Sequence, residues 1–180
     1  MIFSTIAKLY VAKIIQFFPI VLFVYTYRIT HTWETAFFIG GAGALLQTTT
    51  FLALKWQLER LLLAVNLFLV GGAAGMLFKI GWLLDLYDEL MQGTLLMWYA
   101  VIGLITTLCA PTGFLGIEHP NKQLIKQYSW YLLGATVFFV GWSYYFRGET
   151  IIAFMLSGGL PFGCLIALHK YLVRKVITSK

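Results

Sequence analysis

The sequence predicts an all-α, polytopic transmembrane helical bundle of about six spans, and two observations lead to that fold class. Hydrophobic residues make up 60% of the 180 residues, charged residues only 11%, and the mean hydropathy is +0.82. The apolar residues form long runs with the few charges between them, as in helices that cross a bilayer. Strands of a transmembrane barrel would alternate apolar and polar residues instead. We therefore expect a single membrane domain over residues 1–180.

The charged residues divide the chain into six apolar segments. Each is close to the ~20 residues that a helix needs to cross ~30 Å of hydrocarbon. The first segment contains Pro19, which predicts a kink in its helix. The expected spans cover residues 11–27, 35–54, 61–78, 93–116, 128–146 and 151–171.

Lysine and arginine placement predicts the orientation, because cytoplasmic loops of membrane proteins are enriched in both residues. The two sides of the expected bundle alternate from loop to loop without exception, so both termini are expected in the cytoplasm. Ten basic residues fall on the side of the termini: Lys8, Lys13, Lys55, Arg60, Lys122, Lys126, Lys170, Arg174, Lys175 and Lys180. Three fall on the other side: Arg28, Lys79 and Arg147.

Two amides within the expected second and third spans form a candidate pair. Gln47 lies eight residues before Lys55, and Asn66 lies six residues after Arg60. In an antiparallel hairpin these positions differ in depth by about 3 Å. We expect a Gln47–Asn66 hydrogen bond that joins the two helices, worth ~0.6 to 2 kcal/mol.

Small residues recur at helical spacing in the third and sixth spans. Gly71 and Gly75 form a GxxxG pattern, as do Gly159 and Gly163. Such patterns let helix backbones approach closely in lipid. We expect them to pack helices within the chain, and a homo-oligomer interface is the alternative.

The stretch LLDLYDELMQG, residues 83–93, places Asp85, Asp88 and Glu89 on one face of an expected helix. The predicted orientation puts this stretch outside the cytoplasm. Its leucines would rest on the membrane while the carboxylates face water. We expect a solvated face that can dock an external partner, because a tight Ca²⁺ site needs six to eight oxygens.

The sequence contains no motif for catalysis, a cofactor or a metal. HExxH, a serine-centred elbow and a phosphate-binding glycine loop are all absent. Cys109 and Cys164 lie inside apolar runs, as packing residues do. We therefore expect no enzyme activity. The basic residues are spread over four separate segments, which argues against nucleic acid, while those of the C-terminal tail are expected to attract anionic lipid.

The first two spans resemble the bacterial intracellular septation protein A family. The stretch QFFPIVLFVYTY, residues 16–27, is similar to the family's opening pattern at Phe17, Pro19, Phe23 and Tyr27. The family's second span passes through Leu-Gln and Ala-Leu to a basic loop, as here at residues 46–47 and 53–54, with Glu59 and Arg60 closing the loop. The Lys-Trp-Lys that follows the acidic pair in the family is missing here.

The resemblance implies a non-enzymatic protein of the bacterial inner membrane. Its role would be cell-envelope maintenance and septation, through contacts with cell-division and cell-elongation proteins. Two alternatives remain open from the residues: a small transporter or channel for a small solute or ion, and an integral membrane enzyme that acts on lipid.

Overall fold

The computed structural model describes residues 15–54, 59–148 and 150–178, and within these ranges every regular element is helical. The chain divides into two compact units, Met1–Leu84 and Asp85–Lys180. The predicted all-α class is confirmed for the described residues.

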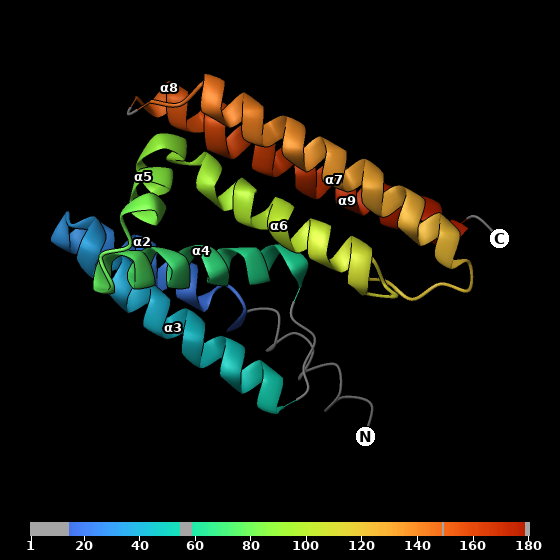
Figure 1. Cartoon of the computed structure of the whole chain (residues 1–180), viewed down its shortest axis with the longest axis horizontal. Helices are drawn as coiled ribbons and strands as arrows, with labels where there is room; N and C mark the ends of the chain where they lie inside the picture. Colours follow the sequence, from blue (N-terminus) through green and yellow to red (C-terminus); the bar gives the residue numbers. More distant parts are fainter. Residues whose placement is uncertain (1–14, 55–58, 149, 179–180) are drawn as a thin grey trace. The chain divides into compact units, whose positions relative to one another are not determined.

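Unit 1 is built from three helices, α2 (Phe18–Thr30), α3 (Trp33–Ala53) and α4 (Arg60–Leu77), which pack side by side (Figure 1). Close approach depends on glycines. A Cβ at Gly41 of α3 would lie 2.9 Å from the Ala73 side chain of α4, and one at Gly40 would lie 2.9 Å from Phe23 Cβ of α2. Small residues on α3 therefore bring all three helices into contact.

An aromatic cluster fills the space between these helices. The ring centroids of Phe23 and Phe37 are 4.9 Å apart, and those of Phe37 and Phe68 are 5.3 Å apart. Phe37 lies directly over Gly72, where an added Cβ would come within 2.4 Å of the ring. Tilted and edge-on ring contacts at these distances add to the packing energy.

Unit 2 contains α6 (Gly93–Cys109), α7 (Lys122–Tyr145), α8 (Ile151–Phe154), a π-helical turn η1 (Met155–Gly159) and α9 (Leu160–Thr178). Helix α7 packs against both α6 and α9. A further helix, α5 (Gly81–Leu90), crosses the boundary between the two units and is bent by 112° relative to α6.

The loop after α6 folds back into unit 2. Phe114 is fully buried, with its ring 4.6 Å from that of Tyr99 and against Gly103. Ser129 Oγ of α7 accepts a hydrogen bond of 2.9 Å from the Phe114 N–H, and His169 of α9 lies 3.1 Å from the Leu115 carbonyl oxygen. This apolar loop is therefore part of the unit's core.

Three helices of the described chain are long and apolar enough to cross a membrane: α3, α4 and the continuous segment Ile151–Thr178. The bent pair α5 and α6 would make a fourth if it forms one span. Helix α2 has 13 residues, which is short for a span, and tyrosines, tryptophans and serines lower the hydropathy of α7. Helices nevertheless occur at all six predicted positions.

Several helices begin or end at other residues than the expected spans. Helix α6 ends at Cys109 instead of residue 116, because Pro111 lies in a turn and Gly113 and Gly116 have positive φ. Helix α7 begins at Lys122, six residues before the expected span, and the Asn121 side chain accepts a cap bond from the Leu124 N–H. The last helix continues to Thr178. Pro19 lies in the first turn of α2, where it needs no N–H donor, and residues 11–14 of the first expected span lie outside the described residues.

Candidate functional site

Two groups of buried polar side chains are candidate sites, one in each unit. In unit 1, Asn66 of α4 is 2% exposed and Gln47 of α3 is 5% exposed. Asn66 Nδ2 donates to Gln47 Oε1 at 2.8 Å and to Thr48 Oγ1 at 3.0 Å. The hydrogen bond predicted from the depth of the two amides is present.

This network extends to the start of α2. Gln47 Nε2 donates to the Ile15 carbonyl oxygen, and the Glu59 N–H donates to the buried Gln16 side chain at 3.4 Å. Amide groups thus tie α3 and α4 to the residues that precede α2. Amides neither titrate nor act as nucleophiles, so the network joins helices rather than performing chemistry.

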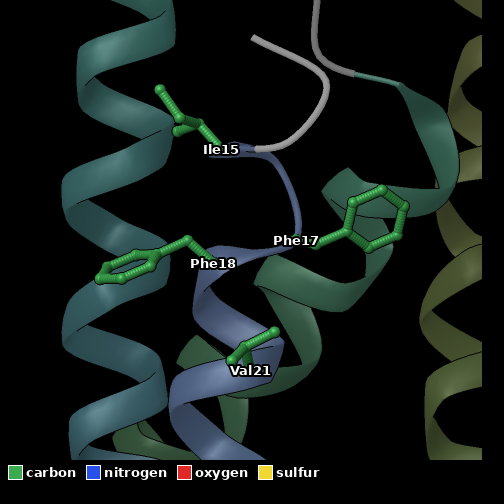
Figure 2. A pocket seen from close by; sticks show the side chains of 4 residues that line it. All are labelled: Ile15, Phe17, Phe18 and Val21. Atoms are coloured by element: carbon green, nitrogen blue, oxygen red, sulfur yellow. The ribbon is translucent and has the colours of Figure 1, made fainter. Parts of the chain in front are cut away.

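A shallow apolar depression adjoins this network, and Figure 2 shows its four lining side chains, Ile15, Phe17, Phe18 and Val21. All four are 41% exposed or more. Because the lining side chains are hydrocarbon, the depression offers contact only to apolar groups such as lipid chains or the side chains of another helix.

The polar group of unit 2 surrounds the break in the last long helix. Pro161 has no N–H, so the carbonyl oxygen of Ser157, four residues earlier, loses its helical partner. The Leu160 N–H bonds to the Met155 oxygen instead of Leu156, which makes the π turn η1. Two carbonyl groups of the helix are thereby released from the backbone ladder.

Side chains of α7 satisfy both released carbonyls. Ser143 Oγ donates to the Ser157 oxygen, and Trp142 Nε1 donates to the Leu156 oxygen at 3.0 Å. In an apolar medium an unpaired carbonyl costs several kcal/mol, so these two bonds allow the break to exist. The π turn was not predicted, although Gly158, Gly159 and Pro161 together were the signal for it.

The surroundings of the break are tightly packed. Ser157 Oγ donates to the Ala153 oxygen at 2.7 Å and lies 3.1 Å from the Gln92 side-chain amide. An added Cβ at Gly93 would lie 3.0 Å from Ser143, and one at Gly158 would lie 3.2 Å from Gln92. The hydroxyl of fully buried Thr94, also in the first turn of α6, has no hydrogen-bond partner.

The acidic stretch forms α5, and Asp85, Asp88 and Glu89 are all exposed, as a solvated face requires. Tyr144 Oη lies 3.4 Å from Glu89 Oε1. On the opposite face, Leu83 and Leu84 contact the Gly75 position of α4. These two leucines therefore pack on α4, whereas they were expected to rest on the membrane. Among the described residues, no three His, Cys, Asp or Glu side chains gather closely enough to hold a metal ion.

The two GxxxG patterns have different surroundings. Gly75 is buried, while Gly71 is half-buried and its neighbour Gly72 makes the close contact with Phe37. Gly159 and Gly163 are exposed, and a Cβ at either position would meet no other helix within 4 Å. The expectation that the second pattern packs helices within the chain is therefore not met in the described part of the protein.

The residues that carry the family resemblance all have structural positions in unit 1. Phe23 lies in the aromatic cluster, Tyr27 stacks on Trp33 with centroids 4.0 Å apart, and Pro19 is fully buried. Phe17 lines the depression, Glu59 is the N-cap of α4 and Arg60 is its first residue. These positions are occupied by groups that shape helix ends and contacts.

The fold and these sites define a membrane protein of packed helices whose buried amides and hydroxyls bond mainly to one another and to the backbone. Comparison with protein-family models, with curated proteins and with solved structures finds no match for this chain.

Proposed function

We propose that this chain is a non-enzymatic protein of the bacterial inner membrane that acts through contacts with other membrane proteins, in the manner of the septation proteins its first half resembles. It spans the membrane six times, with both termini in the cytoplasm. The support for this orientation is the ten-to-three division of basic residues between the two sides.

The observation that carries the proposal is the use of polar groups inside the helix packing. Gln47 and Asn66 bond to each other, and Ser143 and Trp142 bond to the carbonyls at the helix break. These groups maintain the fold instead of facing a substrate. The groups left for function are surface features: the apolar depression at Phe17 and Phe18, and the exposed carboxylates of α5.

Gene deletion and complementation test the proposal. Deletion is expected to change cell length or envelope integrity, and the wild-type chain is expected to restore both. Crosslinking in living cells is expected to recover division or elongation proteins. A triple variant that removes the carboxylates of α5 should reduce that crosslinking (Asp85→Asn, Asp88→Asn, Glu89→Gln). The variant Asp85→Glu keeps the charge and should not reduce it. If deletion caused no phenotype and crosslinking recovered no partner, the proposal would be contradicted.

A small transporter or channel is the second candidate, and the interrupted last helix favours it. Transporters often bind substrates where discontinuous helices meet. The buried hydroxyls of Thr94 and Thr107 without a partner would be groups that a substrate contacts. Flux of small ions or solutes through proteoliposomes containing the purified protein would support this candidate, and sealed proteoliposomes would reject it.

A further inference from the structure

Unit 2 brings basic residues from two separate stretches of the sequence to one end of a helix pair. Helix α7 begins with Lys122 and Lys126, and α9 ends with Lys170, Arg174 and Lys175. The start of α7 and the end of α9 lie side by side near the C-terminus (Figure 1). All five side chains are exposed, so five positive charges lie at the same end of the helix pair.

Lys175 of α9 lies close to an aromatic ring of α7 at this end. Lys175 Nζ of α9 lies 5.6 Å from the ring centroid of Tyr128 on α7 and 5.9 Å from that of Tyr171 on its own helix. A cation within about 6 Å of a ring face is attracted to it. The positive end of the α7 dipole adds to the field at Lys122. Glu118, of opposite sign, is exposed in the loop before α7.

Exposed aromatic and apolar side chains lie within one or two turns of these charges along α7 and α9. Trp130, Tyr131 and Tyr171 are 44%, 56% and 58% exposed, and Ile177 is 64% exposed. Exposed tyrosine and tryptophan beside lysine and arginine are typical of the level of lipid headgroups. A soluble anion needs only the charges, whereas a phospholipid also uses the apolar surface next to them. The combination favours lipid as the occupant.

We infer that the basic end of α7 and α9 is a binding site for the phosphate headgroup of an anionic phospholipid. Each helix supplies a pair of cations four residues apart, Lys122 with Lys126 and Lys170 with Arg174, so a headgroup phosphate can contact two cations on either helix. The site goes beyond the contacts with other proteins proposed above. It does not depend on which proteins those are.

Lipid binding to the full-length, delipidated protein in detergent tests this inference. Native mass spectrometry would compare a cardiolipin-type diphosphate lipid, phosphatidylglycerol and phosphatidylcholine. The wild-type protein is expected to retain the anionic lipids in preference to phosphatidylcholine. The combined variant Lys122→Gln, Lys126→Gln, Arg174→Gln is expected to lose at least about tenfold in affinity for them, because each basic residue near a headgroup contributes to the attraction.

Two further variants make the test specific. Arg28→Gln, Lys79→Gln, Arg147→Gln removes the same number of charges elsewhere and should change affinity by less than about twofold. Lys122→Arg, Lys126→Arg, Arg174→Lys keeps every charge and should retain binding. Three results would each overturn the inference. The two glutamine variants could lose affinity equally, or the wild-type protein could show no preference for anionic lipid. Inorganic phosphate at about 10 mM, the scale of a weak free-anion competitor, could displace the lipid. None of these outcomes bears on partner crosslinking in cells, so the two proposals can fail separately.

Discussion

At the scale of single residues, the packing of the helices depends most strongly on the exact side chains at Gln47 and Asn66. Both amides are almost fully buried, and each makes a second bond, to Ile15 and to Thr48. Their positions could be predicted because the charged ends of the two helices fix the depth of each residue. The additional bond to Ile15 could not, since it depends on where the chain enters α2.

The Gln47–Asn66 bond predicts a measurable coupling. Gln47→Leu and Asn66→Leu should each destabilise the protein, and the double variant should cost less than the sum of the two. The expected coupling energy is ~0.6 to 2 kcal/mol. Thermal unfolding in detergent measures it, with Thr49→Val on the exposed face of α3 as the control. Additive effects would show that the bond contributes nothing.

Gly103 and Gly134 form a matched pair of helical glycines in unit 2. A Cβ at Gly103 would lie 2.5 Å from the Phe114 ring, while one at Gly134 would meet nothing within 4 Å. Gly103→Ala should therefore destabilise the protein by about 1–3 kcal/mol through overpacking. Gly134→Ala should be neutral or slightly stabilising, because alanine favours helix. Equal melting temperatures for the two variants would contradict the buried position of Phe114.

At the scale of elements, hydropathy locates helices better than it locates their ends. The loop after α6 contains Phe114 and Leu115, which are as apolar as residues of a span, so the predicted span runs into it. Composition does not distinguish apolar residues that face lipid from those buried in the protein. Helix α9 continues past the expected span for a related reason: Leu172 and Val176 are buried, although charged residues lie between them.

The helix break makes a prediction about Ser143. Ser143→Ala removes the donor to the Ser157 carbonyl and should cost about 1–3 kcal/mol, as for a buried group left without a partner. In a Pro161→Ala background the new N–H can bond to the same carbonyl four residues earlier. The cost of Ser143→Ala should then be much smaller. A cost that is unchanged by Pro161→Ala would mean that the proline is not the cause of the break.

At the scale of the whole molecule, both proposed surfaces depend on which ends of the helices face the cytoplasm. The lengths of α3, α4 and the last helical segment are sufficient for a bilayer, and the basic residues are distributed unequally between the two expected sides. The proposed partner face on α5 requires Asp88 to lie outside. The inferred lipid site requires Lys126 to lie at the cytoplasmic surface. Both assignments follow from a single topology.

Cysteine labelling in intact cells tests this topology most directly. Cys109 and Cys164, which are both free and exposed, would first be replaced by alanine. Asp88→Cys and Lys126→Cys would then be introduced separately and treated with a membrane-impermeant maleimide. We predict that the cysteine at position 88 reacts in intact cells and that the cysteine at position 126 reacts only after the membrane is permeabilised. The reverse pattern, or reaction of both cysteines in intact cells, would contradict the six-span orientation.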